Sequence, residues 1–373
     1  MIKVLQVAGS LKLGGLETVV MNIVRYSDKD TFKIDIVVYG EEEGDYEAEA
    51  KRLGCRVIHL PFPHKAPLTF VSKLRKVLRQ FGPYDIVHSH TLYNCGLVVK
   101  GAFKEGVTVR ISHSHTNRVG EKVKWSRRLY NAYMRFLIRK YTNVQYACSE
   151  NAGSYLFGVD FIGSGHVLSN GINPDKFIVT EDKRERLKLA LGIKNYYVIG
   201  QIGTLHPVKN HKFSIEIMKE ILKHRADVRM LFIGKGALFE EISHKIENEG
   251  LKGYIYMLGP RNDVPDLLGI LDVYLMPSKY EGVSVALMEA QAAGLHCVVT
   301  NTACAPEVHV TNQITTLTLN DSPSVWAEAI VRSLGKGKYA NSRKAIKNSG
   351  YDIRDIISRL NKDYSTYIKE FAK

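Results

Sequence analysis

The chain has 373 residues, enough for two domains, and 45% hydrophobic with 24% charged residues is the composition of a folded globular protein. A formal net charge of +14 predicts an anionic partner: a nucleic acid, an acidic membrane surface or a phosphate-bearing small molecule. The five cysteines lack CxxC spacing, which argues against a disulfide framework and a zinc knuckle. No uncharged apolar run reaches the about 18 to 20 residues of a membrane span, and the first ten residues resemble a strand more than a leader, so we expect a cytoplasmic protein.

Short β-branched runs alternate with helical patterns through the first half of the chain. Strands are expected at residues 2–8, 33–40, 84–90, 108–115 and 144–149, and helices at residues 15–27, 45–54, 93–106 and 117–141. A second series places strands at residues 197–203, 228–234, 255–259, 273–278 and 296–301, with helices between them. This alternation predicts two mainly parallel sheets, each covered by helices on both faces.

The two series predict two Rossmann-like domains in tandem, an α/β architecture. The break falls in residues 168–177, where Asn-Gly and Asn-Pro supply turns, so we expect domains over residues 1–170 and 171–355. Residues 356–373 continue an amphipathic helix that we expect to pack back on the N-terminal domain. Ligands of such sheets bind at the carboxyl ends of the strands, so the predicted site is a central cleft that both domains face.

Gly14 and Gly15 follow the first strand and open a helix. Glycines at such a place let a phosphate or a sugar approach the backbone and the helix N-terminus. The spacing is neither GxGxxG nor a Walker loop, so a plain tight turn is an equal alternative.

Two His-x-His pairs end two strands of the first half: His88 with His90, and His113 with His115. Residues two apart share one face of a strand, so each pair can place two imidazoles together. Metal binding is one interpretation, although no nearby carboxylate or cysteine completes a ligand set. We favour a single site histidine, His115, at the end of its strand.

Basic residues follow two strands of the second half. Lys209 lies near the start of a helix, after the turn at Gly203, and there it can bind a diphosphate together with helix amide groups. An ordinary surface lysine is the alternative. Arg261 and Asp263 lie in a further loop that leads into a helix.

Glu281 and Glu289 lie eight positions apart, next to a predicted strand at residues 273–276. Ser284 suits the N-cap of a helix, which places Glu281 in the loop ahead of it and Glu289 inside it. Two surface glutamates are the alternative, but the residues between them are mostly apolar. Carboxylates in such surroundings usually have a ligand, so we expect each to contact a different point of an extended molecule.

Together these motifs resemble glycosyltransferase family 4, the retaining, nucleotide-sugar-dependent enzymes of GT-B fold. The resemblance covers nearly the whole chain and depends most on the E-x7-E motif from Glu281 to Glu289. The loops "GGLE" and "KNH" are most similar to bacterial exopolysaccharide or capsule enzymes.

The resemblance implies a role for each matching residue. The acceptor domain is the first and the nucleotide-sugar domain the second. Catalytic roles are implied for His115, which contacts the transferred sugar or the acceptor, and for Glu281 and Lys209. Donor-binding roles are implied for Gly14, Gly15, Gly203, Thr204, Lys209, Arg261, Val264, Glu281, Gly282, Val283 and Glu289. Glu307 matches a further family glutamate of less defined role.

One position departs from the family pattern. Thr204 stands where the family usually has the arginine that partners the lysine on the diphosphate. We therefore hypothesise that Lys209 carries more of the phosphate charge than in other members.

The implied function is transfer of a sugar from a nucleotide-sugar, expected to be a UDP-sugar, to a glycan or polyprenyl-diphosphate-linked acceptor. No metal or other cofactor is expected, and no nucleic acid partner. The alternatives are a catalytically silent nucleotide-sugar-binding subunit, a UDP-sugar epimerase or phosphorylase on the same fold, and a metal-dependent hydrolase built on the histidine pairs. The sequence does not name the sugar, the linkage or the acceptor.

The densest basic run, residues 117–141, includes Arg118, Lys122 and Lys124 and is interleaved with aromatic residues. A solvated helix face is one interpretation. The other is peripheral contact with the anionic inner face of a membrane, with aromatic side chains at the headgroup level.

Overall fold

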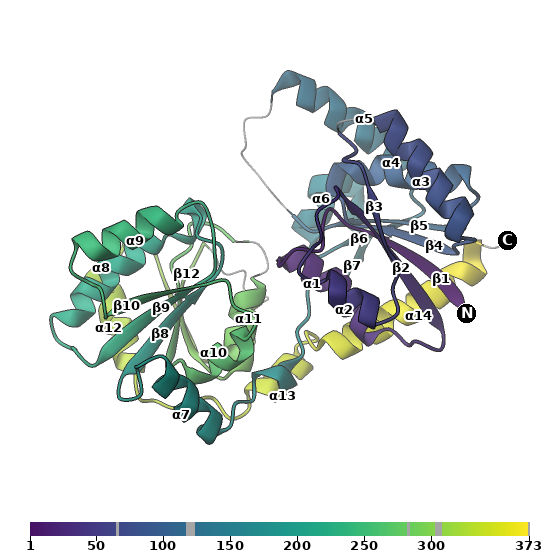
Figure 1. Ribbon diagram of the computed structural model, residues 1–373. Coiled ribbons are helices and arrows are strands. Elements are labelled where there is room, and N and C mark those ends of the chain that lie inside the picture. Colours follow the sequence, from purple (N-terminus) through teal and green to yellow (C-terminus); the bar gives the residue numbers. More distant parts are fainter. Residues whose placement is uncertain (65–66, 117–123, 282–283, 303–307, 372–373) are drawn as a thin grey trace. The chain divides into compact units, whose positions relative to one another are not determined.

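The computed structural model describes the whole chain except residues 65–66, 117–123, 282–283, 303–307 and 372–373. The chain forms two compact units (Figure 1). The first combines Met1–Gly171 with Ile353–Lys373, and the second is Ile172–Asp352. None of the described helices is long and apolar enough to cross a membrane.

The first unit contains a seven-stranded parallel sheet in the order β3-β2-β1-β4-β5-β6-β7. Its strands are β1 (Ile2–Val7), β2 (Phe32–Tyr39), β3 (Val57–Leu60), β4 (Ile86–Ser89), β5 (Val109–Ser114), β6 (Val144–Ala147) and β7 (His166–Val167). Its helices are α1 (Gly15–Tyr26), α2 (Glu47–Arg52), α3 (Pro67–Phe81), α4 (Cys95–Lys104), α5 (Trp125–Tyr141), α6 (Glu150–Phe157) and α14 (Ile353–Phe371), with the 3-10 turns η1 (Leu92–Asn94) and η2 (Val159–Phe161).

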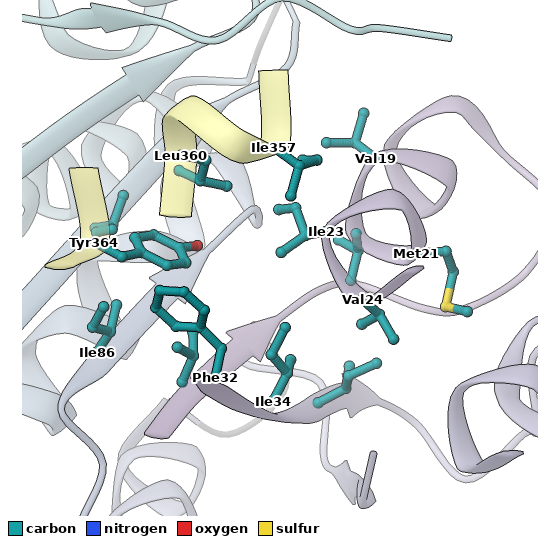
Figure 2. Close-up of a cluster of buried hydrophobic side chains, with 14 of the residues drawn as sticks. Val19, Met21, Ile23, Val24, Phe32, Ile34, Ile86, Ile357, Leu360 and Tyr364 are labelled. Carbon is teal, nitrogen blue, oxygen red and sulfur yellow. The ribbon is translucent and has the colours of Figure 1, made fainter. Parts of the chain in front are cut away.

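Successive side chains of a strand point to opposite faces of the sheet, so the central strands contribute alternate residues to two cores, one on each face. Val4 and Ile36 belong to the core under α1 and α14, whereas Leu5 and Val37 belong to the core under α3 to α6. Figure 2 shows the first core, where Ile357 and Leu360 of α14 approach α1 above Phe32 and Ile86.

The second unit contains a six-stranded parallel sheet in the order β10-β9-β8-β11-β12-β13. Its strands are β8 (Tyr197–Ile202), β9 (Val228–Ile233), β10 (Ile255–Gly259), β11 (Val273–Met276), β12 (His296–Thr300) and β13 (Ile314–Leu317). Its helices are α7 (Glu181–Ala190), α8 (His211–Leu222), α9 (Phe239–Asn248), α10 (Val264–Ile270), α11 (Val285–Ala292), α12 (Pro323–Ser333) and α13 (Ser342–Asn348), with the 3-10 turns η3 (Pro174–Phe177) and η4 (Pro207–Lys209).

The predicted strands are all present, but the sequence patterns did not reveal β3, β7 or β13. Each lies at the edge of a sheet and has only two to four residues, too few for a clear hydrophobic pattern. The second unit ends at Asp352, ahead of the expected domain boundary at residue 355. The C-terminal helix α14 begins at Ile353, which is buried in the core of the first unit.

Candidate functional site

Lys209 and Glu281 form an ion pair in the second unit. Lys209 ends η4 just before α8, and its Nζ donates a hydrogen bond to Glu281 Oε1 at 2.5 Å. Gln201, buried in β8, donates from Nε2 to the main-chain carbonyl of Lys209 at 2.7 Å, and it accepts from the Ser214 hydroxyl at 2.7 Å. The loops after β8 and β11 therefore meet, because these strands are neighbours in the sheet.

The absence of a side chain at Gly203 leaves room for the side chain of Lys209. Its φ of +149° is one that residues with a side chain rarely adopt, and a Cβ atom there would lie 3.0 Å from Lys209 Cε. Thr204, where the family pattern has an arginine, is exposed. The turn thus leaves room for the lysine to lie along the backbone at the end of β8.

Glu289 lies on α11, which Ser284 caps by accepting from the Leu287 amide at 3.4 Å, as the sequence predicts. Burial raises the pKa of Glu289 to about 7, although the positive charge of Lys176 acts in the opposite direction. An ionised carboxylate at this position is therefore short of compensating contacts. Such a group is typical of a ligand-binding residue before its ligand arrives.

Tyr274 of β11 lies close to both glutamates. Its hydroxyl is buried and has no hydrogen-bond partner among the described residues. Burial raises the pKa of Tyr274 well above its ordinary value, and the negative charges of Glu281, then of Glu289, add to that effect. Both carboxylates therefore lie close enough to this unpaired hydroxyl to influence its ionisation.

The loop before α10 contains Arg261, which forms a bidentate pair with Asp263 through Nε at 2.8 Å and Nη2 at 2.6 Å. Arg261 is exposed, and Val264 begins the helix. The remaining predicted residues of this unit, Gly282, Val283 and Glu307, lie outside the described residues.

In the first unit, Gly14 is the N-cap of α1. A Cβ atom at Gly14 would lie 2.4 Å from Glu17 Oε2, so the glycine makes room for a carboxylate that folds back over the helix N-terminus. Glu17 also accepts from the Ser10 hydroxyl at 2.9 Å. Gly15 leaves open space, with no atom within 4 Å of an added Cβ atom.

The four histidines of the two His-x-His pairs form one cluster at the ends of β4 and β5. The rings of His113 and His115 have centroids 3.9 Å apart, and those of His88 and His90 are stacked at 4.2 Å. Burial lowers the pKa of His115 to about 3 and that of the other three well below the ordinary value. All four rings are therefore neutral at pH 7.

His88, His90 and His113 each offer a ring nitrogen, and these atoms lie within 4.8 Å of one another, close enough to consider a metal ion. However, stacked rings point their nitrogen lone pairs in similar directions and not at one point. His88 Nε2 is 3.1 Å from His113 Nδ1, and His90 Nδ1 is 2.8 Å from His115 Nε2. This geometry favours hydrogen bonding among the rings over a shared metal ion.

The sequence patterns missed four polar residues that organise these sites: Gln6, Gln201, Tyr274 and Tyr364. The sequence holds a signal for the two glutamines, since each is a single amide in a mostly apolar strand, "IKVLQV" and "YVIGQI". A buried amide needs hydrogen-bond partners, so such a residue predicts a polar network nearby.

Comparison with known proteins identifies the family of the chain. The family model Glycosyltransferase Family 4 matches residues 13–176, and Glycosyl transferases group 1 matches residues 183–352. EpsF of Bacillus subtilis (strain 168), assigned as a glycosyltransferase, is 32% identical over 364 residues, which are 96% of this chain and 95% of EpsF. The UDP-Gal:alpha-D-GlcNAc-diphosphoundecaprenol alpha-1,3-galactosyltransferase of Escherichia coli is 29% identical over 255 residues, 66% of this chain and 64% of that enzyme.

Among solved structures, HepE from Anabaena in complex with UDP aligns with a TM-score of 0.77 at 17% identity, covering 98% of this chain and 100% of HepE. These findings define a two-domain glycosyltransferase of GT-B fold, as the sequence predicts. The chain belongs to glycosyltransferase family 4.

Proposed function

We propose that the chain is a retaining glycosyltransferase that moves a sugar from a UDP-sugar to a glycan or polyprenyl-diphosphate-linked acceptor in exopolysaccharide or capsule synthesis. The UDP bound to HepE and the lipid-linked substrate in the name of the Escherichia coli relative support this choice of donor and acceptor. The ion pair between Lys209 and Glu281 is the observation that carries the proposal.

In this proposal three residues of the second unit bind different parts of the donor. Lys209, supported by the N-terminus of α8, binds the diphosphate and stabilises its charge as it leaves the sugar. Glu281, released from the lysine, contacts the sugar, and Glu289 holds the ribose hydroxyls. With this lysine in place, no metal ion is required for the departure of the diphosphate.

In the same proposal, His115 of the first unit contacts the transferred sugar or the acceptor. Retention follows if the acceptor enters on the face from which the diphosphate leaves, so that a phosphate oxygen takes the acceptor proton. A covalent sugar on Glu281 is the rival route.

Calorimetric titration with UDP and with uridine tests these roles. Lys209→Met is expected to weaken UDP binding about 10- to 100-fold, the value of a hydrogen bond to a charged group, and to leave uridine binding unchanged. Glu289→Gln is expected to weaken the binding of both ligands, because both contain the ribose. An equal loss of affinity for uridine and for UDP in the Lys209→Met variant would contradict the role of Lys209 in binding the diphosphate.

A catalytically silent binding subunit would also pass that titration, and the exposed Thr204 in place of arginine is the feature that favours this alternative. Release of UDP that depends on an acceptor distinguishes the two functions. An enzyme releases UDP from UDP-sugar in its presence, whereas a silent subunit releases none.

We further propose that α5 rests on an anionic membrane. Its outward face exposes large apolar side chains, with Trp125 74%, Leu129 61% and Phe136 56% exposed. Basic residues on the same helix are also exposed: Lys124, Arg127, Arg128, Arg139 and Lys140. This combination suits the headgroup region, where aromatic rings enter the interface and cations meet lipid phosphates. Arg118 and Lys122 lie outside the described residues.

A further inference from the structure

A buried hydrogen-bond chain runs from the C-terminal helix to the histidines of β4 and β5. The amide nitrogen of Gln6 donates to the Tyr364 hydroxyl at 3.1 Å. That hydroxyl is 2.6 Å from His88 Nδ1, and His88 Nε2 is 3.1 Å from His113 Nδ1. Tyr364 belongs to α14 and therefore reaches this sheet from the far end of the sequence (Figure 2).

A second chain starts from the other end of the same amide. The Gln6 carbonyl oxygen Oε1 is 2.8 Å from His90 Nε2, and His90 Nδ1 is 2.8 Å from His115 Nε2. Each chain ends on a buried nitrogen without a hydrogen-bond partner among the described residues, His113 Nε2 in the first and His115 Nδ1 in the second.

The amide fixes the direction of every hydrogen bond in both chains. The Tyr364 hydroxyl accepts from the Gln6 amide nitrogen, and among the described residues His88 Nδ1 is the acceptor within reach of its own proton. A neutral His88 that accepts at Nδ1 must then donate from Nε2 to His113. Since Gln6 Oε1 can only accept, His90 must donate from Nε2, and its Nδ1 must accept from His115 Nε2. We propose that Gln6 and Tyr364 lock all four histidines in the Nε2–H tautomer, so that His115 presents Nδ1 as a hydrogen-bond acceptor.

The four rings behave as one unit in this arrangement. Reversal of the Gln6 amide would reverse every bond and produce four Nδ1–H tautomers, whereas a mixed state leaves two donors or two acceptors facing each other. Burial keeps the rings neutral, which removes the third possibility of a doubly protonated imidazolium. Gln6 and Tyr364 are thus positioning residues that act on His115 through its neighbours.

The lock has a consequence for substrate recognition, which rests on the proposed function. A neutral His115 with a free lone pair at Nδ1 accepts a hydrogen bond from a hydroxyl group of a sugar. It repels a phosphate or carbonyl oxygen, which offers no proton. His115 therefore selects a hydroxyl group of the sugar and does not bind the anionic part of the donor.

Nitrogen-15 NMR of the full chain with labelled histidine tests the lock directly, since protonated and unprotonated ring nitrogens resonate far apart. In the free protein at pH 7, His88, His90, His113 and His115 are expected to be protonated at Nε2 only, with each signal assigned by its loss in a His→Asn variant. Protonation at Nδ1 in any of the four would overturn the proposal.

Tyr364→Phe provides the second measurement. It removes the proton donor to His88, so His88 and His113 are expected to become mixtures of both tautomers. Tyr367→Phe is the matched control, because Tyr367 lies on the same helix but contacts Tyr146 and His166 instead of the four clustered histidines. No change at His88 in the first variant, or an equal change in the control, would refute the role of Tyr364.

These measurements use no donor and no acceptor. If the tautomers differ from those expected, the proposed transferase activity is untouched. If the tautomers are as expected but no UDP-sugar is consumed, the proposed function fails and the lock remains.

Discussion

At the residue scale, Lys209 and Glu281 illustrate what a local pattern can and cannot reveal. Each was predicted as a site residue from its own loop, but their direct contact was not, because they lie 72 positions apart. The contact depends on β8 and β11 being neighbours in the sheet, which loop motifs do not encode. Tyr274 was missed for a similar reason, since an aromatic residue in a buried strand resembles an ordinary core residue.

Glu289 provides a residue-scale prediction about stability. Its pKa of about 7 in the folded unit exceeds the ordinary value of 4.5, so its stabilising contribution is complete below pH 4.5 and is lost as the pH rises through 7. Glu289→Gln is therefore expected to increase the free energy of unfolding by up to about 3 kcal/mol at pH 8 and to change little at pH 4.5.

Urea denaturation at both pH values measures this difference in the free energy of unfolding, with hydrogen exchange as the monitor of the second unit. Glu240→Gln on α9 is the control, because Glu240 is exposed and the change in charge is the same. Equal stabilisation by Glu289→Gln at pH 4.5 and pH 8 would mean that the carboxylate carries no burial penalty.

At the element scale, α5 and α14 are both amphipathic but use their apolar residues differently. The apolar face of α14 is buried against α1, with Ile357, Leu360 and Tyr364 in the core. On α5, by contrast, only Met134, Leu137 and Ile138 are buried, and further large apolar side chains remain outside. Amphipathic sequence alone predicted both helices, but only the structure shows which of their apolar residues stay exposed.

Cosedimentation with liposomes tests the exposed face of α5. The double variant Arg127→Glu/Arg128→Glu is expected to lose about 2 to 4 kcal/mol of affinity for anionic vesicles, since each basic residue near such a surface contributes about 1 kcal/mol. Lys344→Glu/Lys347→Glu on α13 makes the same change in charge on the other unit and serves as the control. Equal binding of the wild type to neutral and anionic vesicles would remove the proposal.

At the scale of the whole molecule, the alternation of strands and helices predicted the fold class and the tandem order of two sheets. It also placed Lys209, Glu281, Glu289 and His115 correctly at or just beyond strand ends or on the following helix. Gln6 and Tyr364, which lie 358 positions apart, could not be paired from sequence, since only the packing of α14 on the first sheet brings them together.

The two units are expected to lose different amounts of stability in acid. The four clustered histidines have lowered pKa values, so the unfolded chain binds protons below about pH 6.5 while the folded first unit does not. Their stabilising contribution is complete above that pH and is lost as the pH falls, by up to about 1.4 kcal/mol per pH unit for each ring. In the second unit, burial lowers the pKa of His211 to about 4, but protonation of Glu289 relieves a burial penalty over the same range and offsets that loss.

Hydrogen exchange with mass spectrometry at pH 7.5 and pH 5.5, corrected for the intrinsic exchange rate, compares the units within one molecule. Peptides from β4 and β5 are expected to lose protection at the lower pH, whereas peptides from β8 and β11 keep theirs. A uniform loss across both units would contradict the histidine explanation.

The return of α14 to the first unit also affects how the protein is made. Residues up to 171 leave the ribosome early, but the core they form lacks Ile357, Leu360 and Tyr364 until the whole second unit has been synthesised. The second unit is continuous in sequence and can fold without waiting. During translation the nascent chain therefore presents an apolar sheet face that α1 covers only in part, a state that chaperones protect from aggregation.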